Sequence, residues 1–209
     1  MPDLAVEFEF LEAGFQYVGG IDEVGRGALA GPVAVGVVVI SKDVGPIPEN
    51  LTDSKLISKP IRESLIPVLE NWAHDFAIGY ASPSEIDDIG IVGALRLAAN
   101  RAISQLRTKP HQVILDGKHN WLQTNSDESL TKFQVTTKVK ADQSCATVAA
   151  ASVLAKVARD NLMLQADQTY PEYGFAKNVG YGSASHMAAI QKFGPSQFHR
   201  RSWNLPKSG

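Results

Sequence analysis

Residues 33–40, VAVGVVVI, constrain the fold of this chain more than any other segment. They are apolar or glycine throughout and mostly β-branched, without the alternation of a strand that has one face in water. Such a run is typical of a strand buried on both faces. A strand of this kind needs a covering layer on each side, so the segment predicts a sheet flanked by helices.

The remaining pattern places other elements around this strand. Strands are expected at residues 17–24, 73–81, 112–116 and 133–139, and helices at about 60–69, 91–107, 144–166 and 183–193. Ser58 is a predicted N-cap, with Pro60 in the first turn after it, and Ser84 is expected to cap a short turn. Small residues at 149–152 should let their helix approach the sheet closely. This order predicts an α/β fold with a mixed β-sheet flanked by helices.

Composition sets the broad class of protein. The chain has 209 residues, no internal repeat and no linker, which predicts one domain over residues 1–209. No apolar run approaches the length of a membrane span, and the acidic first fifteen residues do not resemble a signal peptide. Cys145 is the only cysteine, so no internal disulfide is possible and a cytoplasmic setting is expected.

Charge is unevenly distributed along the chain. Residues 1–100 hold 6 Lys/Arg and 15 Asp/Glu, whereas residues 101–209 hold 14 and 7. A basic binding surface beside an acidic metal site would produce this asymmetry, and so would chance on a solvated surface. Arg200 and Arg201 are expected to form a solvated basic end.

Four acids stand at the ends of predicted strands. Asp22 and Glu23 end the first strand, Asp116 ends residues 112–116, and Asp142 follows residues 133–139. Strand ends can converge on one edge of a sheet. Oxygen ligands in this number suit Mg²⁺ or Mn²⁺ rather than zinc, and clustered carboxylates can hold two such ions. Taken alone, each acid at a strand end is commonly a cap or turn former. Because neighbours in a strand point to opposite faces, Asp22 and Glu23 can share a site only where the strand ends or bulges.

A glycine-rich turn follows the first acids. Residues 25–30, GRGALA, loosely match the dinucleotide fingerprint G-x-G-x-x-G/A, but that fingerprint must open a helix and a strand follows here. The turn would instead bring backbone N–H groups close to a ligand, with Arg26 facing a phosphate. A simple β-turn between two strands is the alternative.

Together these segments resemble the ribonuclease HII family over about residues 17–203. The matching runs are GIDEVGRGALAGPVAVGVVV (Gly20–Val39), DSK (Asp53–Lys55), VILDGKH (Val113–His119), KADQSCATVAAASVLAKVARD (Lys140–Asp160), GFAKNVGYGSASH (Gly174–His186) and FGPSQFHRRSW (Phe193–Trp203). The resemblance implies an RNase H-like mixed sheet with a small C-terminal helical part.

The resemblance also implies an activity and its residues. Family members cut the RNA strand of RNA–DNA hybrids and incise DNA duplexes containing ribonucleotides, leaving 3′-hydroxyl and 5′-phosphate ends. Asp22, Glu23, Asp116 and Asp142 match the catalytic, metal-binding carboxylates, and substrate contacts match Gly25, Arg26, Gly27, Lys55 and Tyr181. Leu56 replaces a second family lysine, which puts one backbone contact in doubt.

The alternative from another class is a hybrid-binding module without catalytic activity. Basic charge alone would serve binding. Four acids near a nucleic-acid backbone would weaken binding unless metal ions neutralise them. The C-terminal residues LPKSG carry no apolar-aromatic docking motif, so we expect no obligate protein partner and a monomer.

Overall fold

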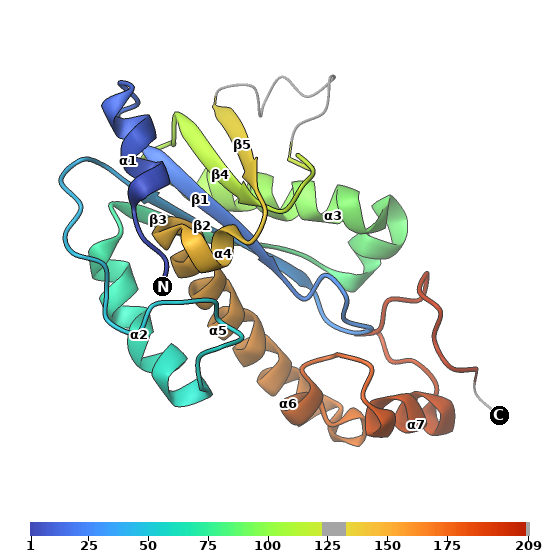
Figure 1. Cartoon of the computed structure of the whole chain (residues 1–209). Coiled ribbons are helices and arrows are strands. Elements are labelled where there is room, and N and C mark those ends of the chain that lie inside the picture. Colours follow the sequence, from blue (N-terminus) through green and yellow to red (C-terminus); the bar gives the residue numbers. More distant parts are fainter. Residues whose placement is uncertain (123–132, 208–209) are drawn as a thin grey trace.

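The structure, a computed structural model, describes residues 1–122 and 133–207, which leaves out the last two residues of LPKSG. Figure 1 shows the arrangement of its helices and strands. The strands are β1 (Val18–Val24), β2 (Val33–Ile40), β3 (Asp75–Ala81), β4 (Gln112–Asp116) and β5 (Gln134–Lys138). The helices are α1 (Ala5–Glu12), α2 (Lys59–Trp72), α3 (Pro83–Gln105), α4 (Ala141–Ser144), α5 (Ala146–Thr169), the 3₁₀ turn η2 (Pro171–Tyr173), α6 (Phe175–Asn178) and α7 (Ala184–Phe193).

The sheet is mixed, as predicted, with strand order β3-β2-β1-β4-β5. β1 is antiparallel to β2 and β2 to β3, whereas β4 is parallel to both β1 and β5. Every residue of β2 is buried, which confirms the prediction from VAVGVVVI. The antiparallel pairing of β1 with β2 follows from chain order, since a short turn joins these two strands.

Helices cover both faces of the sheet. α5 packs on β1 and β2 on one face, and α3 packs on β2 and β3 on the other. The approach is close because glycines face the helices: a Cβ added at Gly36 would lie 2.5 Å from the Ala151 carbonyl oxygen, and one at Gly79 would lie 2.0 Å from that of Ala98. The predicted packing of the small residues of α5 against the sheet is therefore confirmed.

A small C-terminal helical part packs on the second half of α5 (Figure 1). Its core includes Met163 of α5, Phe175 of α6 and Ile190 of α7, and it reaches the β1–β2 turn through Ala30. This contact matters for the site because it joins the β1–β2 turn to the C-terminal helices. Within the described ranges, no helix is both long and apolar enough to span a bilayer.

Several local features differ from the sequence prediction. Helix α1 was not predicted, because AVEFEFLE alternates apolar and acidic residues with a period of two rather than forming a helical stripe. Its Glu7 is buried and accepts a hydrogen bond from the Thr147 backbone N–H (2.9 Å) at the start of α5. The predicted cap Ser84 is wrong: Ser82 caps α3 in a capping box with Glu85. Ser58 does precede α2, but its side chain makes no capping hydrogen bond.

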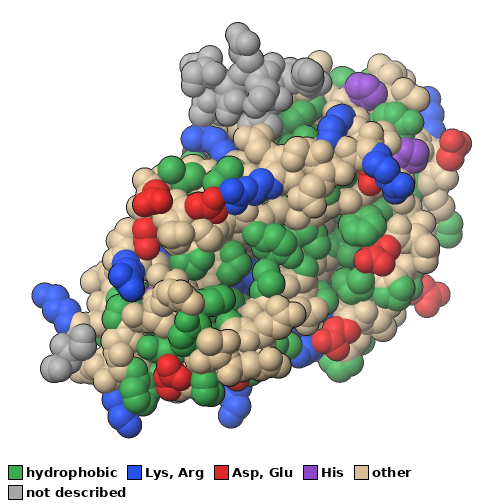
Figure 2. Space-filling model, turned by 180° about the vertical axis from the view of Figure 1, so that it is seen from behind, with side chains coloured by type: hydrophobic (Ala, Val, Ile, Leu, Met, Phe, Trp, Pro, Cys, Tyr) green, Lys and Arg blue, Asp and Glu red, His purple; other side chains and the backbone are tan. Residues whose placement is uncertain are grey.

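Surface charge also differs from a simple basic face. On the face seen from behind in Figure 2, basic and acidic side chains are interspersed among apolar ones. The charge asymmetry along the sequence therefore does not produce a single basic surface on that side.

Candidate active site

The register of the parallel pair β1–β4 brings two of the predicted carboxylates together. The last paired residues are Ile21 and Leu115, and the next residue in each strand is an acid, Asp22 in β1 and Asp116 in β4. Residues opposite each other on neighbouring strands share a face of the sheet. Strand pairing alone thus places Asp22 and Asp116 side by side at the carboxyl ends of the two strands.

Glu23 joins them although β1 neither ends nor bulges at that residue. The sequence predicts a shared site only where the strand ends or bulges, but β1 pairs with β2 residue by residue through Val24. β4 instead ends at Asp116, beside Asp22, and Glu23 lies beyond its last residue. The ending of the neighbouring strand leaves Glu23 beside the same cavity as Asp22.

Asp142 and Lys55 complete the acidic edge from two further segments. Asp142 lies in the first turn of α4, just after β5, and the Lys55 ammonium is 3.8 Å from its Oδ2. The backbone N–H of Ala141 donates to Asp116 Oδ1 (2.7 Å), which joins the start of α4 to the end of β4. Asp53 orients the Lys55 loop by accepting the backbone N–H of Lys55 (2.9 Å).

A cavity of about 450 Å³ lies at this edge. It is lined by seven of the nine predicted site residues: Asp22, Glu23, Gly25, Arg26, Gly27, Lys55 and Tyr181. Besides Val24, three further lining residues, all polar, were not among the predicted site residues: Ser54, Ser152 and Lys156. Ser152 and Lys156 are four residues apart on α5, so polar residues at helical spacing on an apolar helix were the available signal.

Burial and mutual repulsion shape the electrostatics of the carboxylates. Burial raises the pKa of Asp22 to about 7, against a hydrogen bond from Ser152 and with support from the charges of Glu23 and Asp116. Burial likewise raises the pKa of Glu23, partly opposed by Arg26, whose guanidinium lies 3.1 Å from Glu23 Oε1. Burial and Asp116 raise the pKa of Asp142. The edge therefore concentrates negative charge that a cation would stabilise.

The chemistry of these donors fits a hard divalent ion. The set consists of carboxylate oxygens, which Mg²⁺ and Mn²⁺ prefer, and it lacks the Cys and His ligands typical of zinc. Among the described residues, however, no three acidic, His or Cys side chains converge as a ready-made metal site. The carboxylate oxygens instead contact groups of the protein. Glu23 contacts Arg26, Asp142 contacts Lys55, and Asp116 accepts from the Ala141 N–H.

The glycine turn beside the carboxylates is held by an arginine that the sequence analysis assigned wrongly. Arg200, predicted to be solvated, is fully buried and donates to the carbonyl oxygens of Gly25 (2.7 Å) and Arg26 (2.9 Å). Arg201 is exposed, as expected. Carbonyl acceptors supplied by a distant segment decided the position of Arg200, and no local pattern records them.

Tyr181 lines the same cavity as Asp22 and Glu23. Its side chain is 40% exposed, so one side of the ring is available, while the buried Arg159 guanidinium lies 5.7 Å from the ring centroid. The Tyr181 carbonyl oxygen accepts a hydrogen bond from His186 Nδ1 (2.8 Å). The ring is thus presented to the cavity by a fixed backbone. Leu56, the departure from the family pattern, is 71% exposed and has no packing role.

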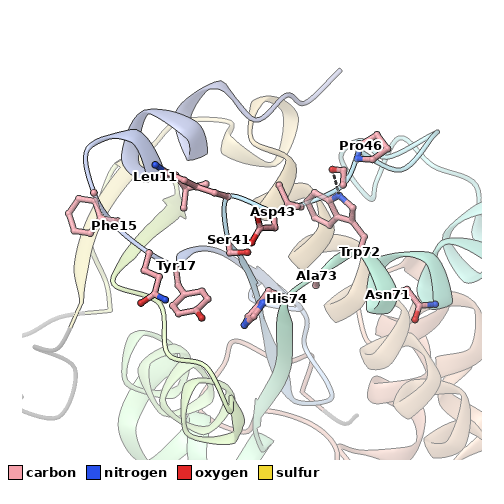
Figure 3. Close-up of a pocket in the computed structure, with 15 residues that line it drawn as sticks. Leu11, Phe15, Tyr17, Ser41, Asp43, Pro46, Asn71, Trp72, Ala73 and His74 are labelled. Atoms are coloured by element: carbon pink, nitrogen blue, oxygen red, sulfur yellow. Dashed lines mark hydrogen bonds between the residues drawn. The ribbon is translucent and has the colours of Figure 1, made fainter.

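A larger cavity, about 740 Å³, lies at the opposite end of β1 (Figure 3). Tyr17, just before β1, packs against His74 with ring centroids 4.8 Å apart, and Trp72 lines the wall near Pro46. Asp43 is its one acidic lining residue. The length of β1 separates this larger cavity from the carboxylates by about 20 Å. The smaller cavity is lined by acidic and basic side chains together, so we assign the candidate site there.

The mixed sheet, with acids at the carboxyl ends of parallel strands, defines an α/β enzyme of the ribonuclease H type. The family model for Ribonuclease HII matches residues 19–205. Ribonuclease HII of Streptomyces avermitilis is 46% identical over 190 residues, 91% of this chain and 78% of that protein. That of Chloroherpeton thalassium is 40% identical over 205 residues, 97% of each chain. The crystal structure of ribonuclease H2 from Pyrococcus horikoshii superposes with a TM-score of 0.72 at 27% identity, covering 90% of this chain and 94% of that one.

The chain therefore belongs to the ribonuclease HII family. It is a hydrolytic endoribonuclease of the ribonuclease H type, a class that acts on RNA–DNA hybrids. The alternative of a binding module without catalytic activity does not fit a family of hydrolytic enzymes.

Proposed function

We propose that this protein cuts the RNA strand of RNA–DNA hybrids and incises DNA duplexes at embedded ribonucleotides, leaving 3′-hydroxyl and 5′-phosphate ends. The observation that carries the proposal is the β1–β4 register, which places Asp22 and Asp116 side by side next to the glycine turn and Tyr181. Asp22 and Glu23 therefore share one cavity with groups suited to a sugar-phosphate backbone, and Asp116 lies beside Asp22 at its edge.

Asp22, Glu23, Asp116 and Asp142 would hold the divalent ions, Mg²⁺ or Mn²⁺, with two bound alongside substrate. When bound, such ions activate water and stabilise the leaving oxygen of a phosphodiester. Lys55 and Arg26 now contact Asp142 and Glu23, and these contacts would give way to the ions. Both cations would then be free to contact substrate phosphates.

The turn and Tyr181 are assigned to recognition of the ribonucleotide. Within the described part of the chain, the backbone N–H groups of Arg26 and Gly27 donate to no protein acceptor. A Cβ added at Gly27 would meet nothing within 4 Å, so a ligand can approach this backbone closely. The 2′-hydroxyl is what distinguishes RNA from DNA, and it can accept from these N–H groups. Tyr181 offers its exposed ring to the next sugar.

Cleavage mapping tests the proposal. Three substrates are compared, with Mg²⁺, Mn²⁺ or a chelator: a DNA duplex with one ribonucleotide, the same duplex without it, and a continuous RNA–DNA hybrid. We expect metal-dependent cuts in the first and third, with 3′-hydroxyl and 5′-phosphate ends. Cutting of the all-DNA duplex, or 3′-phosphate products, would refute it. Tight binding without cutting would favour the hybrid-binding module instead.

A further inference from the structure

Two arginines are fully buried beneath the glycine turn. Arg159, from α5, donates to the carbonyl oxygens of Pro32 (2.8 Å), Ala30 (3.1 Å) and Val179 (2.9 Å). The first two carbonyls belong to the end of the turn, and the third precedes the Gly180–Tyr181 segment. Arg159 therefore joins both the glycine turn and the Gly180–Tyr181 segment, the two parts assigned to ribonucleotide recognition, to helix α5.

Arg200, from the C-terminal segment, holds the beginning of the same turn. Its guanidinium donates to Gly25 and Arg26, as described above, and through two nitrogens to the Gly31 carbonyl (3.1 and 3.0 Å). Its backbone N–H also donates to the Leu29 carbonyl (2.9 Å). A planar guanidinium with five donors suits this task, because it binds several acceptors at fixed angles.

The two networks decide which groups of the turn face outward. The two arginines donate hydrogen bonds to carbonyls along the turn. The N–H groups of Arg26 and Gly27, in contrast, have no acceptor among the described residues. Gly25 has φ +83°, and a Cβ there would lie 2.0 Å from Arg159 Nε, so the arginine packs directly against the turn. The Leu29 N–H also donates to the Gly180 carbonyl (2.8 Å), which joins the turn to the tyrosine segment.

Keeping two cations buried here is energetically unfavourable in itself. Within the described residues, neither guanidinium forms an ion pair with a carboxylate. Buried charges without counter-ions are tolerated only when their hydrogen bonds are satisfied, as they are here by backbone carbonyls. An arrangement this costly is expected where a fixed geometry has functional value.

We propose that Arg159 and Arg200 are positioning residues for ribonucleotide recognition. They lock the Gly25–Gly31 turn and the Tyr181 segment into one surface whose free N–H groups face the ribonucleotide. This inference rests on the proposed function of the turn. Neither arginine contacts substrate, so each acts through the turn that it holds.

Binding measurements on the full chain test the inference without cleavage. Kd is measured by fluorescence anisotropy in Mg²⁺, for a DNA duplex with one ribonucleotide and for the same duplex without it. Asp116→Asn is present in every protein compared, including the one with wild-type arginines, so that the duplex is bound without being cut. Arg159→Lys and Arg200→Lys keep the charge but lose the forked geometry, and we expect each to reduce the preference for the ribonucleotide about tenfold, as for loss of a charge-assisted hydrogen bond. The matched control is Arg101→Lys, because Arg101 also donates to a carbonyl, that of Tyr80 (2.8 Å), on the other side of the sheet.

The outcomes separate this inference from the function on which it rests. A wild-type protein with no preference refutes ribonucleotide recognition by the turn, and the role of the arginines with it. A wild-type preference that survives in both variants, as in Arg101→Lys, overturns the arginine role alone.

A milder variant covers the case in which the lysine variants do not fold, which thermal unfolding reveals. Asp87 holds the residues after Arg200 by accepting from the N–H groups of Arg201 (2.8 Å) and Ser202 (2.9 Å) at the surface. Asp87→Ala loosens the seat of Arg200 without removing it. A reduced preference for the ribonucleotide then supports the inference, and an unchanged preference overturns it.

Discussion

The carboxylate edge and the glycine turn adjoin in space but are held in different ways. Asp22 and Asp116 owe their positions to strand pairing, because each directly follows the last paired residue of β1 or β4. The turn is held by side chains far away in sequence, since Arg159 is 127 positions from Pro32 and Arg200 is 175 positions from Gly25. In Figure 1 the turn after β1 reaches toward the C-terminal segment at the far end of the chain.

This difference teaches where each function is vulnerable. The charge of a carboxylate can be removed while strand pairing keeps the fold. A change in the turn or its supports alters backbone geometry, so it should affect stability and specificity together. The predictions below exploit that contrast.

The largest expected effect comes from neutralising an acid. Asp116→Asn should reduce cleavage at least about 1,000-fold, in line with removal of a principal electrostatic group, because the amide keeps the shape and loses the ligand charge. Hybrid affinity and the thermal unfolding midpoint should change little. Steady-state cleavage at saturating Mg²⁺ measures the effect, with Asp43→Asn in the larger cavity as the control. Near-normal turnover of Asp116→Asn would exclude this acid from the site.

The next effect separates the two glycines of the turn. Gly25→Ala should lower the free energy of unfolding by about 3 kcal/mol, because the residue has positive φ and the new Cβ would collide with Arg159. Gly27→Ala has open space, so its stability should stay within about 0.5 kcal/mol of wild type.

Urea unfolding measures both glycine variants, and single-ribonucleotide cleavage is measured alongside. Gly27→Ala should fold normally yet lose ribonucleotide incision, because its methyl group stands where the 2′-hydroxyl approaches. Normal incision by Gly27→Ala would mean that the ribonucleotide is read elsewhere.

Acid should weaken the tyrosine side of the site through two buried histidines. Ser196 N–H donates to His199 Nδ1 (3.0 Å), so His199 Nε2–H donates to His186 Nε2 (3.0 Å), and His186 in turn holds the Tyr181 carbonyl. Burial, with help from His186, lowers the pKa of His199 to about 4. At His199 the folded state therefore binds fewer protons than the unfolded state between about pH 6.5 and 4.

The stability that His199 contributes is thus present above about pH 6.5 and falls as pH drops through that window. Asp22, whose pKa is raised, acts in the opposite direction, so the effect is read as a difference between proteins. Between pH 7 and pH 5 the free energy of unfolding of wild type should fall by about 2 kcal/mol relative to that of His199→Asn. Urea unfolding at both values measures it, with His199→Asn as the comparison because Asn does not titrate. An equal pH dependence in wild type and variant would remove the histidine pair as the cause.

The smallest effect concerns the tyrosine ring. Tyr181→Ala should slow incision at a single ribonucleotide about tenfold, as for loss of one aromatic contact, and continuous hybrids should be affected less. Tyr181→Phe should keep most activity, since stacking depends on the ring rather than the hydroxyl. Competition cleavage with both substrates in one tube gives the ratio directly. Equal small losses on both substrates would show a purely structural Tyr181.

Much of the fold could be predicted from sequence because its signals are local. VAVGVVVI specified a buried strand, and the small residues of α5 specified close packing on the sheet. α1 could not be predicted, because its alternating residues resemble a strand until Glu7 meets Thr147 at the start of α5. The order of the strands predicted a mixed sheet, but not which strands would be neighbours.

By itself the sequence determined which side chains bear charge at strand ends, since the residues that follow each apolar run mark where the strand stops. Tertiary structure alone decided that Glu23 faces the cavity because β4 ends early, and that Arg200 is buried rather than solvated. The physical reason lies in the partners. A strand end is encoded by neighbouring residues, whereas a buried guanidinium is fixed by carbonyl acceptors that only folding brings from the other end of the chain.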